Sequence, residues 1–313
     1  MRVVVIGGTG HIGSYLTPRL FDAGHTVLCV CRGMKAPYRE HPVWSQVQYV
    51  HLDRTAEEEA GNFGGRIASL DGDAIVDLTC FQPESARQLV RTLQGRIRHF
   101  LHCGTIWVHG HSVEVPTTED APRTPFGEYG IHKHAIEQYL LEEAGSGFPA
   151  TILHPGHLVG PGWNPINPQG NFNPEVFDLI AADRGLMLPN LGMETVHHVH
   201  ADDVAQAFAC ALDHREECVG QAFHIVSPRA LTLRGYAERI AAFLGQPAKL
   251  AFLPFEQWKD TVSERDARVT FDHIAHSPNC SIEKARRLLG YNPRYSSCEA
   301  VQESIAGIRR NTL

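Results

Sequence analysis

The feature that most constrains the fold is a glycine-rich turn between a short apolar segment and an amphipathic one. Residues 2–6 read RVVVI, GGTGHIG follows at once, and apolar positions at helical spacing continue to residue 24. Gly7 permits a tight turn, Gly10 lets a ligand approach the backbone, and Gly13 lets a helix pack closely on a strand. The chain is therefore predicted to begin with a strand–turn–helix unit, the opening of a βαβ fold.

Short apolar segments then alternate with helical patterns, which predicts a parallel sheet covered on both faces. The expected strands are residues 2–6, 25–32, 47–53, 73–81, 97–105 and 148–156, and the clearest helices are 83–95 and 126–147. We predict an α/β protein with a Rossmann-type doubly wound parallel sheet and a smaller C-terminal substrate-binding lobe. The dinucleotide-binding domain is predicted over residues 1–160. The lobe is predicted over residues 161–313, partly interleaved with late elements of the first domain.

The amino-acid composition changes in the second half of the chain. Residues 164–177 are rich in Asn, Pro and Gly and indicate an ordered loop that leads into a helix. Helices are expected at 201–214, 232–245 and 281–293, with a strand at 221–227.

Charge and composition exclude several classes of protein. The net charge is −7, which disfavours a general nucleic-acid binder. The sequence contains no run of 18 apolar residues, so no membrane span is predicted. The N-terminus indicates a strand rather than a charged leader, so we expect a cytoplasmic protein. The eight scattered cysteines are expected to be reduced. His198 and His200 share one face of a strand, but no further ligand has metal spacing, so no metal site is predicted.

The ends of the first strands indicate the cofactor. A pyrophosphate is expected on the glycine-rich turn, at the positive end of the following helix. Cys31 and Arg32 end the second strand where NAD-specific proteins have an acidic residue, and Lys35 follows. Arg32 could pair with a 2′-phosphate, so NADP is favoured over NAD. Asp53 is a candidate partner for the adenine amino group.

Taken together, six motifs resemble the extended short-chain dehydrogenase/reductases, the NAD-dependent epimerase/dehydratase superfamily. They are GGTGHIG, CGTIWVHG, YGIHK, HPGHLVGPG, HHVHADDVAQAF and KARRLLGYNP, in this order. The resemblance implies that Tyr129 is the general acid/base, that Lys133 binds the nicotinamide ribose, and that Thr105 holds the substrate oxygen. Tyr129 and Lys133 share a helical face, and a neighbouring ammonium is expected to lower the pKa of a phenol. The complete set of predicted cofactor residues is Gly7, Gly10, His11, Ile12, Gly13, Arg32, Asp53, Arg54, Thr79, Cys80, Lys133, Pro155 and His157.

Departures from the family pattern narrow the reaction. Ile106 and Trp107 stand where the 4,6-dehydratases carry an Asp–Glu pair, so dehydration is disfavoured. Val196 replaces an Arg that pairs with phosphates in nucleotide-sugar epimerases, and His109 replaces a Tyr. Arg265, Arg268 or Arg294 could still meet a diphosphate. The substrate pocket is predicted to be lined by Trp107, His109, His157, Asn171, Asn173 and His197.

Two functions remain open from the sequence. The first is an NAD(P)-dependent oxidoreductase or epimerase acting at a carbinol or carbonyl carbon of a sugar, a nucleotide sugar or a small cyclic alcohol or ketone. The alternative is an RNA-binding or regulatory protein on the same scaffold, because CRGMKAP resembles the chloroplast stem-loop RNA-binding members. Against RNA stand the net charge and the intact Thr105, Tyr129 and Lys133. The resemblance further implies a homodimer, formed through the helix with Tyr129 and the helix before it.

Overall fold

The larger lobe is built on a seven-stranded sheet in which every strand pair is parallel. The computed structural model describes residues 1–310. The strand order is β11-β6-β5-β4-β1-β2-β3, so the order reverses beside β1, as in a doubly wound sheet. The strands are β1 (Arg2–Ile6), β2 (Thr26–Cys31), β3 (Gln48–His51), β4 (Ala74–Asp77), β5 (His99–Cys103), β6 (Ala150–Pro155) and β11 (Ala222–Ile225). This is the predicted fold class.

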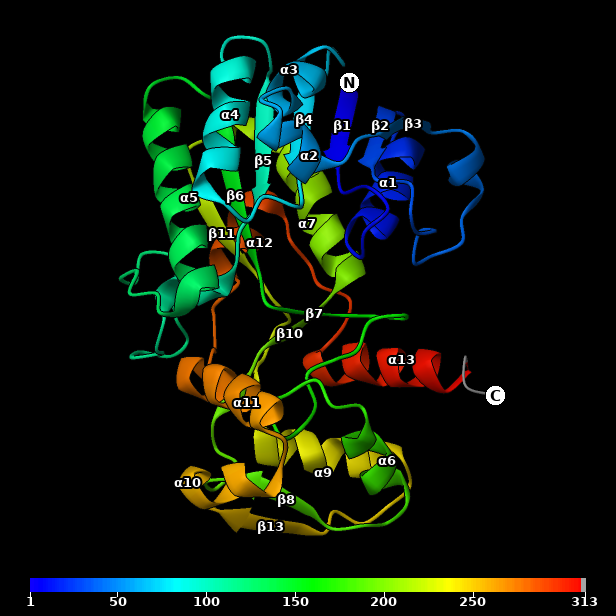
Figure 1. Cartoon of the computed structure of the whole chain (residues 1–313), viewed down its shortest axis with the longest axis vertical. Coiled ribbons are helices and arrows are strands. Elements are labelled where there is room, and N and C mark those ends of the chain that lie inside the picture. Colours follow the sequence, from blue (N-terminus) through cyan, green and yellow to red (C-terminus); the bar gives the residue numbers. More distant parts are fainter. Residues whose placement is uncertain (311–313) are drawn as a thin grey trace.

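Helices cover both faces of this sheet (Figure 1). One face carries α1 (Gly13–Asp22), α7 (Ala201–Asp213) and α12 (Glu283–Leu289), and the other carries α3 (Phe63–Ala68), α4 (Pro83–Leu93) and α5 (Gly127–Gly145). Successive side chains of β1 enter different cores: Val3 and Val5 pack with α1 and α7, whereas Val4 and Ile6 pack with α3 and α4. Because both faces are covered, β1 is apolar throughout.

The smaller lobe lies beyond the carboxyl ends of the strands (Figure 1). Its core joins Tyr236, Ile240, Val301 and Ile305 from two helices. The elements are α6 (Glu175–Ala181), β8 (Leu186–Pro189), β9 (Thr195–Val196), β12 (Leu231–Thr232), α9 (Leu233–Phe243), β13 (Leu250–Leu253), α10 (Phe255–Trp258), η3 (Lys259–Thr261), α11 (Glu264–His276) and α13 (Ser297–Arg310).

Short strands and helical turns complete the chain. The parallel pair β7 (His157–Val159) and β10 (His198–His200) joins the two lobes. The remaining elements of the larger lobe are η1 (Pro42–Ser45), α2 (Arg54–Glu59), η2 (Ile106–His109) and α8 (Arg215–Cys218). Because α7, α8, β11 and α12 all pack in the larger lobe, residues 201–225 and 283–289 return to it after the first segment of the smaller lobe.

Local sequence signals explain several helix boundaries. Pro83 occupies the first turn of α4, where its missing N–H costs nothing. Gly290 ends α12 with a φ of 68°, in the left-handed region that favours glycine. Ser263 caps α11 by accepting a hydrogen bond from the N–H of Asp266 at 3.1 Å. No helix within residues 1–310 has the combined length and apolar character needed to span a bilayer.

Candidate functional site

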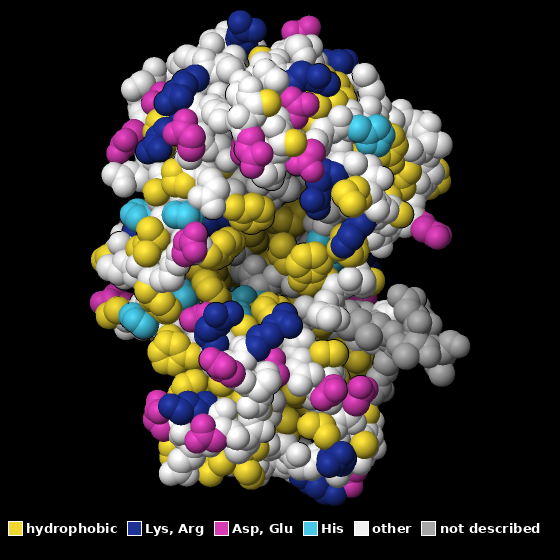
Figure 2. Space-filling view, in the orientation of Figure 1, with side chains coloured by type: hydrophobic (Ala, Val, Ile, Leu, Met, Phe, Trp, Pro, Cys, Tyr) yellow, Lys and Arg dark blue, Asp and Glu magenta, His cyan; other side chains and the backbone are white. Residues whose placement is uncertain are grey.

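A long cleft runs along the carboxyl ends of the central strands. It consists of two cavities, of about 440 and 580 Å³, which share Gly7, Gly10, Tyr38, Thr79 and Phe81 in their walls. Figure 2 shows the hollow between the two lobes, with mainly hydrophobic side chains around it. Ligands of doubly wound sheets bind at this edge, beside the point where the strand order reverses. The geometry therefore suits a long ligand that enters both cavities.

The glycine-rich turn forms the middle of the cleft. Gly7 adopts a φ of 87°, and a Cβ on Gly13 would lie 2.5 Å from the carbonyl oxygens of Gly7 and Gly8. On the cavity side, a Cβ on Gly10 would approach within 4 Å of only one atom, the Gly7 carbonyl oxygen. The N–H groups of His11 and Ile12 donate to no acceptor in the described residues. Free donors at the start of α1, with the helix dipole behind them, fit a pyrophosphate.

The smaller cavity has a cationic rim. Arg32 and Lys35 line it, are exposed, and form no ion pair within residues 1–310. Asp53 also lines it, but its carboxylate caps α2 by accepting from the N–H of Thr55 at 3.0 Å. The guanidinium of Arg54 already forms ion pairs within the protein, with Asp77 at 2.7 Å and with Glu58 at 2.6 Å. The unpaired cations suit the phosphate of an adenosine moiety.

His11 turns its ring toward the larger cavity. It stacks on Trp163 at 4.9 Å between ring centroids, and Tyr38 lies 5.2 Å away. Neither ring nitrogen has a partner in the described residues. Burial, followed by the nearby His200, lowers the pKa of His11 to about 3, so the ring is neutral at pH 7. The predicted cofactor residues Thr79, Pro155 and His157 line the same cavity, whereas Cys80 lines neither cavity.

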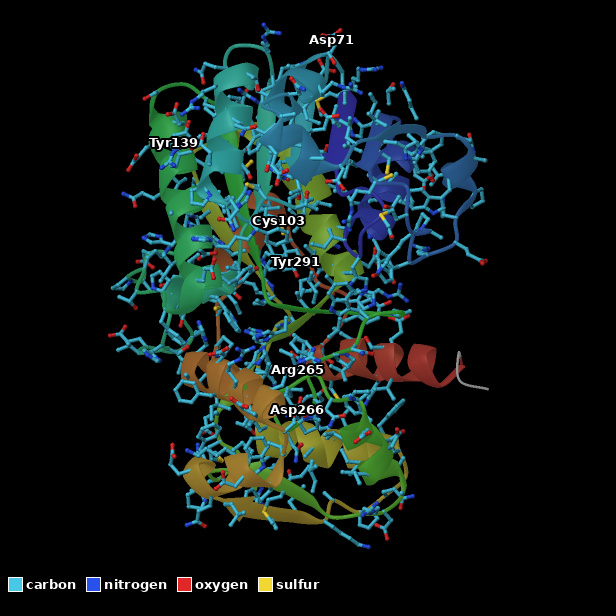
Figure 3. The ribbon with its side chains drawn as sticks, viewed as in Figure 1. Asp71, Cys103, Tyr139, Arg265, Asp266 and Tyr291 are labelled. Carbon is cyan, nitrogen blue, oxygen red and sulfur yellow. The ribbon has the colours of Figure 1, made fainter. Side chains whose placement is uncertain are left out.

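Thr105, Tyr129 and Lys133 meet at the other end of the larger cavity. Thr105 follows β5, and Figure 3 labels Cys103, two residues before it. Its hydroxyl caps η2 by accepting from the N–H of Trp107 at 3.3 Å. Tyr129 and Lys133 are one turn apart on α5, and both face the cavity. The three side chains therefore border the same cavity.

The ammonium of Lys133 is held by the main chain. Its Nζ donates to the carbonyl oxygens of Cys80 at 2.7 Å and Cys103 at 2.6 Å. An ammonium has three donors, so one remains for a ligand. Burial lowers the pKa of Lys133, and these contacts hold the group in place.

The pKa of Tyr129 differs from the expectation. Tyr129 borders the open cleft and is 42 % exposed, yet desolvation by the surrounding protein raises the pKa of its phenol to about 12. A hydrogen bond with Thr105 opposes this rise. The Lys133 ammonium lies 6.0 Å from the ring centroid and is engaged by carbonyls. Without cofactor, desolvation and then the nearby Cys103 raise the pKa of Tyr129, which is the opposite of the expected lowering.

Aromatic and imidazole rings form the wall opposite the glycine-rich turn. Trp107 stacks on His276 with centroids 4.0 Å apart and lies edge-on to Tyr129 at 6.0 Å. Its Nε1 donates to Nε2 of His157 at 3.4 Å. His273, on α11, lines the cavity and donates through Nδ1 to the carbonyl of Val269 at 2.7 Å. The site therefore combines flat apolar surfaces with a few polar atoms.

Four of the predicted substrate residues lie outside the cleft. His109 turns inward, with its Nε2 2.8 Å from Nε2 of His224. His197 is fully buried, and Ser227 and Cys280 bind its ring at 2.8 and 3.1 Å. Asn171 accepts a hydrogen bond from the side chain of Asn167 at 2.6 Å. Asn173 accepts one from the N–H of Glu175, the first residue of α6, at 3.0 Å. Their polar atoms stabilise loops and strand ends, so only Trp107 and His157 of the predicted wall face the cavity.

The structure adds lining residues that sequence reasoning missed. They include Tyr38, Phe81, Trp163, Phe172, Asp272 and His273. Phe172 lies in the predicted ordered loop of residues 164–177 and Trp163 directly precedes it, so loop composition gave a partial signal. Asp272 and His273 belong to α11, which was not predicted, although the Ser263–Asp266 spacing is a helix-start pattern. The pKa of Asp272 is raised by burial, against the effect of Arg268.

The histidines considered for a metal have protein partners. His198 contacts the carbonyl of Ile166 at 3.3 Å through Nε2. His200 lies 2.8 Å from the carboxylate of Glu303 and accepts the N–H of Asp202 through Nδ1. No group of three potential metal ligands occurs within residues 1–310.

Several known proteins are similar to this chain in sequence. The 2′-dehydrokanamycin reductase of Streptomyces kanamyceticus is 27 % identical over 259 residues, which span 82 % of this chain and 70 % of that protein. The chloroplast stem-loop binding protein of 41 kDa b of Arabidopsis thaliana is 23 % identical and spans 97 % of this chain and 78 % of its own.

A solved structure of UDP-glucuronic acid 4-epimerase from Bacillus cereus, with UDP-glucuronic acid and NAD, has the same fold. It matches with a TM-score of 0.74 and 18 % identity, covering 99 % of this chain and 100 % of that one. The sequence profile of the NAD dependent epimerase/dehydratase family matches residues 3–225. The chain therefore belongs to the NAD dependent epimerase/dehydratase family, whose members are extended short-chain dehydrogenase/reductases.

Proposed function

We propose that this protein is a nicotinamide-dependent ketone reductase, or alcohol dehydrogenase in the reverse direction. The observation that carries the proposal is the position of Thr105, Tyr129 and Lys133 at one end of a cleft whose middle is the glycine-rich turn. A dinucleotide seated on that turn would extend from the cationic rim to these three side chains.

The residues at this end have distinct tasks. The nicotinamide cofactor supplies the hydride for the carbonyl carbon in reduction and accepts it in oxidation. Tyr129 donates the proton to the carbonyl oxygen, so that one hydride and one proton convert the ketone to the alcohol. The Thr105 hydroxyl holds the same oxygen, and the free donor of Lys133 binds a cofactor hydroxyl. The pKa of Tyr129 is raised to about 12, so the phenol is protonated at neutral pH, as a proton donor must be.

Reduction is supported over dehydration by the side chains around Thr105. Ile106 and Trp107 follow it in η2, so no carboxylate stands where a dehydratase needs its acid and base. The relative from Streptomyces kanamyceticus is named a reductase. Transient oxidation within an epimerisation uses the same three residues, and product analysis separates the two reactions.

The substrate that fits best is a cyclic ketone or alcohol without a diphosphate. Trp107, Phe172 and His273 provide flat surfaces for a ring, and Asp272 provides an acceptor for hydroxyl or amino groups. Lys133 is the sole Lys or Arg in this cavity wall among the described residues, and carbonyls bind it. Arg265 and Arg268 are exposed on α11, outside the wall (Arg265 is labelled in Figure 3).

NADP(H) is the cofactor favoured by the adenosine end of the cleft. The solved Bacillus cereus structure contains NAD. At 18 % identity, however, the cofactor of that protein does not indicate which cofactor this chain prefers. Here Arg32 and Lys35 have no partners in the described residues, and Cys31 is buried at the end of β2. A 2′-phosphate would neutralise these cations.

The test combines cofactor titration with a substrate panel. NADPH and NADH are titrated by fluorescence, and NADPH oxidation is followed with cyclic ketones, amino-sugar ketones and UDP-glucose, with product analysis for each. We expect tighter binding of NADPH and turnover of a ketone that carries no phosphate. Arg32→Ala should weaken NADPH binding by about 10-fold or more, because a charged hydrogen bond contributes about 1.5–3 kcal/mol, and should leave NADH binding unchanged.

Two results would contradict the proposal. If neither NADPH nor NADH binds at micromolar concentration, the cleft is not a dinucleotide-binding site. Interconversion of UDP-sugars with no activity on other ketones assigns an epimerase. RNA retention that survives Tyr129→Phe, with no cofactor binding, would support the RNA-binding alternative instead.

A further inference from the structure

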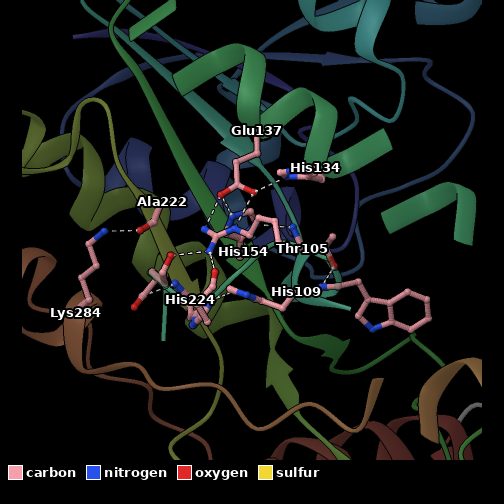
Figure 4. Close-up of polar contacts among 12 residues, drawn as sticks. Thr105, His109, His134, Glu137, His154, Ala222, His224 and Lys284 are labelled. Atoms are coloured by element: carbon pink, nitrogen blue, oxygen red, sulfur yellow. Dashed lines mark hydrogen bonds and ion pairs between the residues drawn. The ribbon is translucent and has the colours of Figure 1, made fainter. Parts of the chain in front are cut away.

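We propose that His154 and Glu137 form a positioning pair that fixes the main chain of Thr105. The N–H of Thr105 donates to Nδ1 of His154 at 2.8 Å, and Nε2 of His154 lies 3.1 Å from Oε1 of Glu137. Thr105, His154 and Glu137 are 6 %, 0 % and 2 % exposed. Figure 4 shows the chain of contacts that runs from Glu137 through His154 to the start of η2.

The hydrogen bonds define which nitrogen of His154 carries the proton. A backbone N–H can only donate, so Nδ1 must present its lone pair to Thr105. In the neutral ring Nε2 then carries the hydrogen and donates it to the carboxylate of Glu137. Glu137 therefore selects the one tautomer that can accept from Thr105. A histidine held in this way by a carboxylate orients the group on its other side.

Glu137 is itself firmly anchored. Arg123 donates to its two oxygens, at 2.8 Å from Nη2 and 3.4 Å from Nε, and also binds the carbonyls of Glu119 and Ala121. Burial alone would raise the pKa of Glu137, but His154 and Arg123 hold it well below its usual range. The carboxylate is therefore charged and fixed at neutral pH, as the pair requires.

The pair links the two elements that carry the proposed reaction. Glu137 is one turn beyond Lys133 and two turns beyond Tyr129 on α5, whereas Thr105 follows β5. A shift of α5 relative to β5 would separate the Tyr129 phenol from the Thr105 hydroxyl. His154, on β6, bridges α5 and the end of β5 and so limits this shift.

The backbone beside Thr105 is shaped to receive the imidazole ring. A Cβ on Gly104 would lie 2.3 Å from Nδ1 of His154 and 2.7 Å from its Cε1. A side chain at residue 104 would push the ring away and break the bond to Thr105. This fit is independent of the hydrogen bonds and indicates that the ring is placed against this peptide group.

Two substitutions of His154 separate positioning from simple packing. In His154→Asn the side-chain oxygen occupies the place of Nδ1 and can accept from Thr105, but the side chain is too short to reach Glu137. In His154→Gln a polar atom reaches the place of Nε2 and Glu137, but no acceptor remains at Nδ1. Both variants lose a buried ring, so their stabilities form a matched comparison.

The first readout is amide hydrogen exchange of the segment 103–107, which requires no substrate. We expect faster exchange in His154→Gln, by about tenfold or more, and near wild-type protection in His154→Asn. The second readout rests on the proposed function: kcat of ketone reduction should fall by about 10- to 100-fold in His154→Gln, since a small misplacement of reacting groups has effects of this size. The dissociation constant of NADPH and the KM should change by less than about threefold in His154→Gln.

Equal exchange and equal kcat in the two variants would overturn the proposal, because His154 would then act by packing alone. A loss of NADPH binding with unchanged exchange would also overturn it, since the effect would lie in the cofactor site. If His154→Gln fails to fold, Glu137→Gln takes its place, with the same expected rise in exchange at residues 103–107. Absence of any ketone reduction contradicts the proposed function alone, and the exchange measurement still decides the role of His154.

Discussion

At the scale of single residues, the phenol of Tyr129 is the proposed proton donor. Its pKa is raised to about 12 by desolvation, so the acid form persists far above neutral pH. The proton donor of a ketone reductase must be protonated, and this form is lost as the pH rises through the pKa. We therefore expect the rate of ketone reduction to show no loss of this donor between pH 6 and 9.

Tyr129→Phe tests this role directly. Removal of the proton donor should lower kcat by about 100- to 10,000-fold, whereas NADPH binding should remain within about threefold. The control is Tyr139→Phe on the same helix, because Tyr139 lies outside the cavity wall and packs under Arg87. Retention of full turnover in Tyr129→Phe would show that another group supplies the proton.

Glu137 should also make the fold sensitive to acid. Its folded-state pKa is depressed, so its contribution is complete above the ordinary carboxyl pKa of about 4.3 and is lost as the pH falls toward the depressed value. Glu137→Gln removes one partner of a buried pair and should lower the free energy of unfolding at pH 7 by about 3–5 kcal/mol. The difference from wild type should shrink as the pH falls below 4.

The measurement is chemical unfolding at pH 7, 5 and 3.5. Glu142→Gln is the control, because Glu142 is exposed on the same helix, and such changes usually alter stability by less than about 0.5 kcal/mol. A pH-independent difference between Glu137→Gln and wild type would contradict the depressed pKa.

At the scale of elements, the packing of α1 on β1 depends on a missing side chain. A Cβ at Gly13 would meet the carbonyl oxygens of Gly7 and Gly8 at 2.5 Å, and these backbone atoms cannot move aside cheaply. Gly13→Ala should therefore lower the free energy of unfolding by about 1–3 kcal/mol and weaken NADPH binding. Calorimetry and cofactor titration measure the two effects.

Gly65→Ala is the matched control for this substitution. Gly65 is exposed in α3, its φ is not positive, and a Cβ there meets no atom within 4 Å. Alanine at an open helical position is expected to stabilise by about 0.5–1 kcal/mol. If the two variants shift stability in the same direction, the close packing at Gly13 is not the cause.

Periodicity allowed most elements of the larger lobe to be predicted, and its failures have a physical reason. The segments 83–95 and 126–147 contain α4 and α5, and Pro83 and Gly95 marked the two ends of the first of them. The helix α11 was missed, since its buried side includes Thr270, His273 and His276 and looks polar in sequence. Tertiary packing, not hydrophobicity, buries these side chains.

At the scale of the whole molecule, the site exists only where the two lobes face each other. Tyr129 and Thr105 come from the larger lobe, whereas Phe172, Asp272 and His273 come from the smaller one. The chain crosses between the lobes several times, and β7 pairs with β10 at the crossing (Figure 1). The relative position of the walls therefore depends on both lobes being folded.

The predicted homodimer is a further expectation at this scale. Ile136 and Leu140 of α5 face the sheet and are fully buried, so they are not available for a contact between subunits. Ile131 is 50 % exposed on the same helix and could contribute to such a contact. We expect light scattering at micromolar concentration to give twice the mass of the chain, and Ile131→Lys to favour the monomer. A monomeric wild-type protein would refute the prediction.

The sequence by itself determined the strand–turn–helix start, the alternation of strands and helices, and the grouping of Gly7, Gly10 and Gly13, because local backbone and spacing rules encode them. It also placed Tyr129 and Lys133 on one helical face. Only the tertiary structure showed that His109 turns to His224, that α11 supplies His273, and that His154 joins Glu137 to Thr105. The raised pKa of Tyr129 belongs to the same group. These features depend on which distant segments pack together and on how much water they exclude, and no local pattern of residues carries that information.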